Sequence, residues 1–277
     1  MLETRGLTVR FGGHVAVNDV SCSFAPGTLT AIVGPNGAGK TTYFNLISGQ
    51  LKATAGTVSL DGQLLSGQSA SARTRAGLGR AFQLTNLFPN LTVLENVRLA
   101  VQATREGAHR RGLNLWSIWS DHRALTERAD AILAEVALKA KEHATVASLP
   151  HGDQRKLEVA LLMALEPKVF MFDEPTAGMH AAEAPVILDL IRALKKDRTK
   201  TILLVEHKMD VVRELADRII VLHNGQLVAD GAPSEVIASP IVQEAYLGLP
   251  AAGAEDASRH VTAPIPAFPR AGEGATP

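Results

Sequence analysis

The sequence predicts an α/β fold built around a mainly parallel sheet. Short apolar runs at 169–172 and 201–205 suit strands that are buried on both faces, and segments with helical patterns follow them. A glycine-rich turn at 34–39 joins another apolar run to a helical pattern. Before that turn, residues 2–11 and 14–24 have the pattern of two strands. The 277 residues suffice for one large α/β domain or two small ones.

The composition argues against several classes of protein. The 28 basic and 28 acidic residues give a formal net charge of zero, which argues against a nucleic-acid partner. The single cysteine, Cys22, excludes an internal disulfide, fits a reducing compartment, and is expected to be a small buried apolar residue. The N-terminus lacks the apolar region of a secretory signal, and no apolar run is long enough to span a bilayer. We therefore expect a soluble chain whose membrane role would come through a partner.

The first two strands meet at Gly12-Gly13, and Phe11 ends the first of them. An aromatic side chain at this place could stack on a nucleotide base, and the alternative is a core or hairpin aromatic. Pro26-Gly27 predicts a turn before the next strand. Further along, 57–62 alternates apolar and polar residues before a turn, which is typical of a half-buried strand.

The glycine-rich stretch has the pattern of a P-loop, and its residues are Gly34, Pro35, Asn36, Gly37, Ala38, Gly39, Lys40, Thr41 and Thr42. It follows the apolar run 29–33 and opens a helical pattern over 40–48, which is the context that a P-loop requires. Glycines let successive N–H groups point at phosphate oxygens, and the helix N-terminus adds its positive dipole end. Lys40 can reach the β- and γ-phosphates, while the Thr41 hydroxyl can bind magnesium. This stretch predicts nucleotide binding on a P-loop NTPase core, and the alternative is an ordinary turn before a helix.

The middle of the chain combines a short strand ending at 81–83 with helical segments. The loop at 84–89 carries apolar residues that look exposed, and the capping box Thr92 to Glu95 predicts a helix to about residue 102. The pattern then breaks at 105–121, which we interpret as an insertion. Its two tryptophans, at 116 and 119, suit either a contact surface or a cap on a small helical core.

The second half of the chain alternates helices and strands and ends in a tail of different composition. Ala, Pro and Gly dominate 250–277, so this tail is expected to be disordered. The expected elements are helices at 122–137, 153–165, 182–196, 207–216, 233–238 and 241–246, strands at 169–172 and 201–205, and a hairpin over 219–228.

Two adjacent carboxylates, Asp173 and Glu174, follow the buried strand at 169–172. Hydrolysis of a nucleotide needs a carboxylate near the metal and a base for the water. Beyond the end of a strand, both side chains can turn toward the crevice where α/β proteins bind ligands. The alternative is a solvated acidic turn, which the four preceding apolar residues and the P-loop make less favourable.

Taken in order, these motifs resemble the ATP-binding subunit of ABC transporters over residues 2–249. Residues 34–42 match the Walker A motif, 169–174 match Walker B, and 177–180 occupy the place of the D-loop. The signature motif corresponds to Leu149, Pro150, His151, Gly152, Asp153 and Gln154. The resemblance implies an N-terminal antiparallel β subdomain, an α-helical subdomain inserted at about 84–165, and ATP with Mg²⁺ as cofactors.

The same resemblance assigns roles to individual residues. It implies that Asp173 binds magnesium, that Glu174 is the catalytic base, and that His207 lies near the γ-phosphate. Gln83 matches the Q-loop glutamine, which touches the metal and senses the membrane partner in the family. Phe11 matches the aromatic residue that stacks on the base, which favours that interpretation over a core or hairpin role.

The branch with the greatest likeness is the ATP-binding subunits of branched-chain (hydrophobic) amino acid uptake systems. The likeness rests on the signature helix at 151–158, the segment 174–179, the insertion near 105–121 and the ending 245–248. Branches that import urea or short amides share several of these details. An exporter subunit would carry a similar motor. A soluble ABC-type ATPase acting on ribosomes or DNA is less favoured, because the sequence has no second ATPase unit and no long coiled-coil insertion.

Two residues depart from the family pattern. Pro150 replaces the signature serine and brings neither a hydroxyl nor a backbone N–H, while His180 replaces the D-loop aspartate. In the family, both motifs face a second ATPase subunit, so the departures weaken the site that this chain completes for its partner. One interpretation is an asymmetric heterodimer in which Lys40 and Glu174 hydrolyse ATP against an intact partner signature. The opposing interpretation is that Gly152, His151 and the helix dipole suffice.

The resemblance also implies partners and a location. The expected partners are a second ATP-binding subunit, membrane permease subunits and, indirectly, a periplasmic solute-binding protein. The chain would lie on the cytoplasmic face of the inner (plasma) membrane as a peripheral subunit. Leu84, Leu87 and Phe88 could seat a permease helix, and packing within the helical subdomain is the competing explanation.

Overall fold

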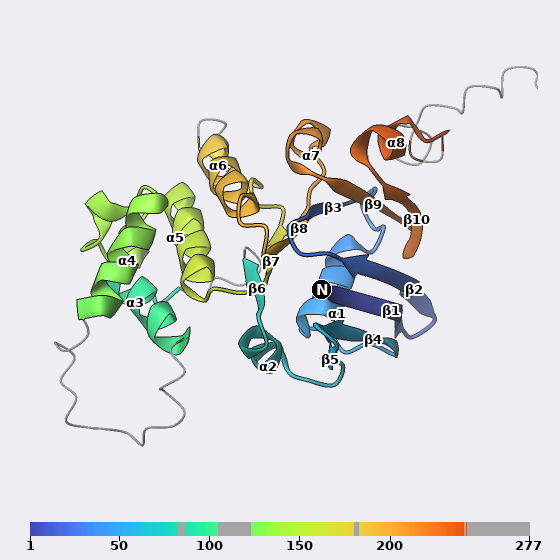
Figure 1. Cartoon of the computed structure of the whole chain (residues 1–277), viewed down its shortest axis with the longest axis horizontal. Coiled ribbons are helices and arrows are strands. Elements are labelled where there is room, and N and C mark those ends of the chain that lie inside the picture. The colour runs from blue at the N-terminus through green and yellow to red at the C-terminus, as the bar shows by residue number, and fades with distance from the viewer. Residues whose placement is uncertain (82–86, 105–122, 180–182, 241, 243–277) are drawn as a thin grey trace, which may run out of the picture.

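The computed structural model describes the chain except for residues 82–86, 105–122, 180–182, 241 and 243–277. Two sheets and a bundle of helices make up the molecule (Figure 1). The six-stranded sheet has the order β10-β9-β3-β8-β7-β6, and only its β9–β10 pair is antiparallel. Its strands are β3 (Leu29–Val33), β6 (Leu78–Ala81), β7 (Val169–Asp173), β8 (Thr201–Val205), β9 (Arg218–His223) and β10 (Gln226–Gly231).

The second sheet is antiparallel and contains the N-terminal strands in the order β2-β1-β4-β5. Helix α1 (Lys40–Ser48) packs between the two sheets, because Tyr43, Phe44 and Ile47 are buried together with residues of both. Helix α2 (Ala70–Arg75) leads back to β6. The strands of this sheet are β1 (Leu2–Phe11), β2 (His14–Phe24), β4 (Ala55–Leu60) and β5 (Gln63–Leu64).

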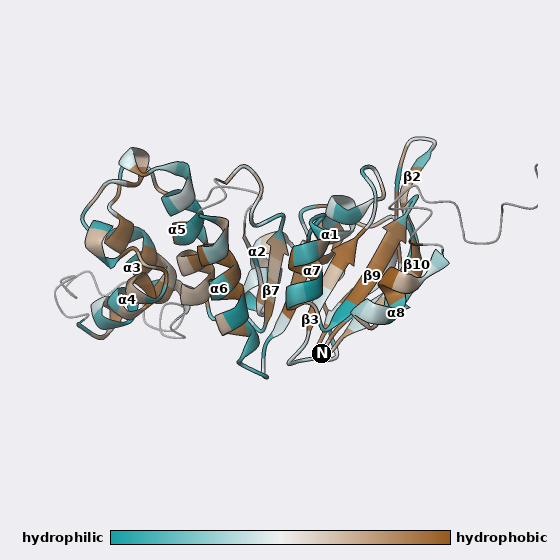
Figure 2. Cartoon of the chain, turned by 90° about the horizontal axis from the view of Figure 1, so that it is seen from above, coloured by the Kyte–Doolittle hydropathy of each residue, from teal (hydrophilic) through white to brown (hydrophobic). Residues whose placement is uncertain are grey.

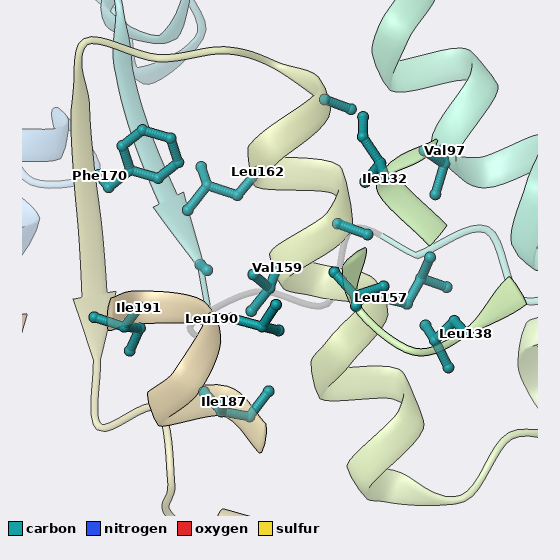
Figure 3. Close-up of a cluster of buried hydrophobic side chains, with 14 of the residues drawn as sticks. Val97, Ile132, Leu138, Leu157, Val159, Leu162, Phe170, Ile187, Leu190 and Ile191 are labelled. Atoms are coloured by element: carbon teal, nitrogen blue, oxygen red, sulfur yellow. The ribbon is translucent and has the colours of Figure 1, made fainter. Parts of the chain in front are cut away.

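The helical subdomain lies beside the β6 end of the parallel sheet (Figure 1). It contains α3 (Val93–Thr104), α4 (Arg123–Glu135) and α5 (His151–Ala164), with two short 3₁₀ turns, Lys139–Lys141 and Val146–Ser148, between the last two. Figure 3 shows that α5 presents Leu157 toward α3 and α4, and Leu162 toward Phe170 on β7. One continuous apolar core therefore joins this subdomain to the sheet.

Helix α6 (Ala184–Lys195) covers the opposite side of the same core with Ile187, Leu190 and Ile191 (Figure 3). Helices α7 (Met209–Leu215) and α8 (Pro233–Ala238) pack against the β3 and β9 end of the sheet. Figure 2 shows that strands such as β7 and β9 are hydrophobic, whereas helices such as α5 and α7 also carry hydrophilic residues. Strands β3, β7 and β8 are thus shielded on both faces, as their continuous apolar runs predict.

The α/β class, the parallel sheet and the order of the predicted elements are confirmed. The prediction for the signature helix was wrong at its start, because α5 begins at His151 and not at 153. The half-buried strand predicted at 57–62 is β4, which begins and ends two residues earlier. Helix α2 and the two-residue strand β5 were not predicted, since neither is long enough to show a period. The predictions for 105–121, 241–246 and 250–277 fall on or extend into residues outside those described.

Two local signals gave the expected contacts. The capping box is present, because Glu95 N–H donates to the Thr92 hydroxyl at 3.2 Å and Thr92 N–H donates to Glu95 at 2.7 Å. The β9–β10 hairpin turns at Asn224 and Gly225, both with positive φ, as Asn-Gly predicts. Among the described residues, no helix combines the length and apolar character needed to span a bilayer.

Candidate functional site

The candidate site lies at the carboxyl edge of four strands of the parallel sheet. Strand β3 leads into the P-loop, β8 ends just before Glu206 and His207, and β7 ends at Asp173. Strand β6 pairs with β7, and it carries Arg80 one residue before its end. Because the carboxyl ends of parallel strands meet at one edge, residues distant in sequence are brought together here.

Two glycines give the P-loop its shape. Gly34 and Gly39 have φ angles of 151° and 96°, in the region that L side chains rarely adopt. A Cβ at Gly34 would lie 2.1 Å from the carbonyl oxygen of Leu222, and one at Gly39 would lie 2.5 Å from that of Ala16. The loop therefore packs so closely on neighbouring strands that only glycine fits at these places.

Lys40 begins helix α1 and is 8% exposed. Its ammonium group donates to the carbonyl oxygens of Gly34 at 2.6 Å and Pro35 at 2.9 Å, so the side chain lies back over the loop. Burial lowers the pKa of Lys40, and the nearby charges of Glu174 and Asp173 oppose this. The predicted P-loop lysine is thus close enough to both predicted carboxylates for their charges to affect its pKa.

Asp173 forms a buried ion pair with Arg80, whose Nη2 donates to Oδ2 at 2.7 Å. The side chains are 8% and 7% exposed. Burial raises the pKa of Asp173. The positive charge of Arg80 lowers that pKa in part, and the negative charge of Glu174 raises it further. Arg80 also donates to Asn45 at 2.7 Å and Ser48 at 3.0 Å, both on α1. It therefore joins the Walker B carboxylate to the P-loop helix.

Sequence analysis did not identify Arg80. A charged residue within the short strand Leu78–Ala81 was the signal that could have found it. Its guanidinium also lies 5.4 Å from the centre of the Phe44 ring, so an aromatic face covers part of it.

Glu174 has a left-handed backbone with φ of 48°, and its N–H donates to the carbonyl of Val205 at 3.0 Å. This conformation turns the chain out of β7 directly after Asp173. Oε1 of Glu174 lies 3.9 Å from Nδ1 of His207. The structure thus brings together the two residues that the sequence predicts as catalytic base and γ-phosphate histidine.

A second carboxylate, Glu206, lies on the inner side of His207 and is 0% exposed. Its Oε1 accepts a hydrogen bond from the Thr176 hydroxyl at 3.3 Å, and its Oε2 lies 4.0 Å from Nδ1 of His207. Lys208 donates to the same Thr176 hydroxyl at 3.4 Å. Sequence analysis did not single out Glu206, although it follows an apolar strand just as Asp173 ends one.

The signature residues surround the start of α5. Leu149 is buried, Pro150 precedes the first turn without a side-chain hydrogen bond, and Asp153 pairs with Lys141 and Lys156 of its own chain. Gln154 donates to the Leu149 carbonyl at 3.1 Å. The helix N-terminus is therefore held by local contacts, with His151 exposed.

Gly152 is in close contact with a carboxylate on another element. A Cβ at Gly152 would lie 2.4 Å from Oε1 of Glu183. Any side chain at position 152 would therefore displace Glu183.

Phe11 is 51% exposed at the end of β1, so it is not a core aromatic. Its place in the β1–β2 hairpin is compatible with both a hairpin role and base stacking. Gln83 and His180 lie outside the described residues.

The residues present fit a nucleotide with magnesium. A Cβ at Gly37 would point into open space, as expected for a loop that a phosphate approaches. Thr41 and Asp173 could supply two oxygen ligands, and Mg²⁺ is usually held by one or two carboxylates together with phosphates. No group of three or more His, Cys, Asp or Glu residues in the described part of the chain could hold a metal ion.

Comparison with known proteins agrees with this geometry. A family model described as ABC transporter matches residues 17–177. The chain belongs to the ABC transporter family. It is 38% identical over 249 residues to the high-affinity branched-chain amino acid transport ATP-binding protein LivG of Escherichia coli K12, covering 90% of this chain and 98% of LivG.

Solved ABC cassettes have the same fold. The ADP conformation of the cassette MJ1267 matches with a TM-score of 0.74 at 30% identity, over 90% of this chain and 99% of MJ1267. A dimeric post-hydrolysis structure of MJ0796 with ADP and Pi matches with a TM-score of 0.70 at 26% identity, over 84% and 99%. The chain is thus an ABC ATPase cassette that binds nucleotide, as the P-loop predicts.

Proposed function

We propose that this ABC cassette hydrolyses ATP to power the import of branched-chain amino acids through membrane permease subunits. The observation that carries the proposal is the full-length similarity to LivG, combined with a set of ATPase residues at one edge of the sheet. The solute is inferred from the relative, because the site described here acts on the nucleotide.

The P-loop residues Gly34 to Thr42 hold the phosphates through backbone N–H groups and Lys40. Lys40 releases its bonds to the loop carbonyls to do so. Thr41, Asp173 and Gln83 provide the ligands for Mg²⁺, which when bound neutralises charge on the phosphates. Phe11, exposed at the end of β1, stacks on the base.

Glu174 orients and deprotonates the attacking water, and His207 contacts the γ-phosphate. Their separation of 3.9 Å supports a shared site, and their half-exposed side chains leave both accessible. The left-handed backbone of Glu174 directs the carboxylate out of the sheet edge, beyond the buried Asp173.

A second ATP-binding subunit completes the site. The dimeric MJ0796 structure supports such an assembly. Leu149 to Gln154 at the start of α5 would then face the partner's nucleotide, whose γ-phosphate would meet the helix N-terminus. The cassette would bind as a peripheral subunit on the cytoplasmic face of the inner membrane.

An apolar groove of about 360 Å³ supports the permease contact. It lies between β6, α3 and α5, and Phe88 and Leu99 are 55% and 43% exposed beside it. Leu87 packs against the helical core, which favours the packing explanation for that residue, whereas Phe88 remains available to a permease helix. Leu84 lies outside the described residues.

The proposed domain organisation is an ABC domain over 1–249 with a helical subdomain at about 84–165. The apolar core shared by α3, α4 and α5 supports this subdomain, and its continuity with β7 makes it part of one domain. The tail at 250–277 is assigned no role in catalysis.

The decisive experiment is reconstitution of the cassette with its permease subunits in vesicles, with leucine and the binding protein supplied on the outside. We expect leucine-stimulated ATP turnover that falls at least about a hundredfold in Glu174→Gln. Asp210→Asn is the matched control, because it removes an exposed carboxylate outside the proposed catalytic set. Leucine-independent turnover in the wild type, or full activity of Glu174→Gln, would overturn the proposal.

A further inference from the structure

Glu206 is a buried carboxylate that the roles assigned so far do not use. It is 0% exposed, and its Oε2 has no hydrogen-bond partner among the described residues. A buried carboxylate oxygen without a partner is unfavourable, because it has lost water and gained nothing in exchange. Such an oxygen next to a reaction centre suggests a bond that forms in another state of the cycle.

A candidate donor is the imidazole of His207. Its Nδ1 lies 4.0 Å from Oε2 of Glu206 and 3.9 Å from Oε1 of Glu174. The imidazole nitrogen therefore lies between two carboxylates at nearly equal distances. A movement of about 1 Å would convert either approach into a hydrogen bond.

The two carboxylates differ in how firmly they are held. Glu206 is enclosed, and Thr176, itself buried, donates to its Oε1. The Glu174 side chain is 43% exposed and that of His207 is 49% exposed. The anchored acceptor is therefore Glu206, and His207 and Glu174 have more freedom to move.

Burial and the neighbouring groups act in opposite directions on the pKa of Glu206, and burial has the larger effect. Burial raises the pKa of Glu206, while His207, the Thr176 hydroxyl and Lys208 oppose this. Glu174, whose Oε1 approaches the same Nδ1, is the other acid that faces His207.

We propose that Glu206 is a positioning residue that accepts the Nδ1–H of His207 during the ATPase cycle. This bond fixes the ring so that Nε2 is the nitrogen that faces the γ-phosphate. It also keeps Nδ1 from binding Glu174, so that the base is free to hold the attacking water. The inference rests on the roles proposed for His207 and Glu174, and it adds Glu206 to the proposed site as a third residue.

The logic is that of a buried acid that orients a histidine and sets which nitrogen carries the proton. Without Glu206, Nδ1–H would turn to Glu174, and the imidazole would then occupy the acid that the water needs. The expected defect is therefore in the chemical step and not in nucleotide binding.

The first test is long-range ¹H–¹⁵N NMR of the ¹⁵N-histidine-labelled full chain with Mg²⁺ and ADP, in which His207→Ala assigns the resonance. We expect Nδ1 of His207 to be protonated in the wild type. In Glu206→Ala the proton should stay on Nδ1 but turn to Glu174, so the Nδ1 signal should shift or broaden. Glu206→Gln, which keeps an acceptor oxygen, should restore part of the wild-type pattern. An unchanged His207 spectrum in Glu206→Ala would overturn the inference.

The second test is steady-state ATP turnover in the assembled transporter. Glu206→Ala should lower kcat about tenfold or more with the KM for ATP within about twofold, and it should have little further effect in a His207→Ala background. Asp210→Asn, an exposed acid nearby, is the matched control. Equal effects of Glu206→Ala in both backgrounds would also overturn the inference.

Thr176→Val is a second variant that tests the inference if Glu206→Ala does not fold. It keeps the shape of residue 176 and removes the hydroxyl that donates to Glu206. We expect the same change in the His207 spectrum, only smaller, and no change would count against the anchoring role. If Glu174→Gln retains turnover, the proposed function fails. If Glu174→Gln abolishes turnover but the His207 spectrum is unchanged in Glu206→Ala, only this inference fails.

Discussion

At the scale of single residues, the site depends on buried charges that compensate one another. Arg80 and Asp173 are paired at the carboxyl edge of β6 and β7, with hardly any exposure to water. Three further bonds from Arg80 Nη1, to Asn45, Ser48 and Gln50, fix the guanidinium in one position. The carboxylate proposed to bind Mg²⁺ is therefore oriented by the protein itself.

Arg80→Met should destabilise the fold by about 3–5 kcal/mol, because Asp173 would remain buried without its counter-charge. Urea unfolding, monitored by circular dichroism, measures this loss. Arg80→Met combined with Asp173→Asn should recover at least about 1 kcal/mol of it, since the uncompensated charge is then gone. Strict additivity of the two substitutions would contradict a buried, coupled pair.

At the scale of elements, the P-loop helix is held at both ends. Its N-terminus follows the glycine loop, and Arg73 on α2 donates to the carbonyls of Leu46 and Ile47 in its last turn, each at 2.7 Å. Carbonyls in the last turn of a helix have no N–H donor within the helix, so the Arg73 guanidinium supplies the missing donors. Helix α2, unpredicted from sequence, thus stabilises the predicted helix.

Arg73→Met should lower the free energy of unfolding by about 1–3 kcal/mol, because two buried carbonyls would lose a charged donor. Arg75→Met is the matched control, since Arg75 is exposed on the same helix and should change stability by less than about 0.5 kcal/mol. Thermal and urea unfolding of both variants provide the comparison. Equal losses in the two variants would show that the capping bonds contribute nothing.

At the scale of the whole molecule, the cassette has two unlike regions that would face a second ATP-binding subunit in the proposed dimer. The P-loop edge carries the proposed ATPase residues of this chain, whereas the start of α5 carries Pro150 without a capping side chain. Glu183 lies against Gly152, so the anion-binding end of α5 already has a carboxylate beside it. This arrangement supports the asymmetric heterodimer over a pair of equivalent sites.

Pro150→Ser should raise ATP turnover at the partner's site several-fold, because it restores a hydroxyl at the signature position. The assembled transporter is assayed with this chain's Glu174 replaced by Gln, so that only the partner's site turns over. Ala147→Ser, which adds a hydroxyl at an exposed position before the same helix, is the control. No change in turnover or in ATP affinity would favour the opposing interpretation, in which Gly152, His151 and the helix dipole suffice.

The α/β class, the order of the strands and helices, and the P-loop could all be predicted from the sequence. These follow from signals that act over a few residues: apolar runs, glycines that permit positive φ, and the Thr92 to Glu95 capping box. The same signals placed Asp173, Glu174 and His207 at strand ends, where they indeed meet. Short elements such as α2 carry too little pattern to be predicted.

The pairs of side chains that complete the candidate site could be identified only in the folded chain. Arg80 and Asp173 are 93 residues apart, and Thr176 and Glu206 are 30 apart, so no local pattern records their contacts. The parallel sheet brings them together because it places the carboxyl ends of β6, β7 and β8 side by side. Burial makes these pairings important for stability, because a charge in the interior requires a partner and a charge in water does not.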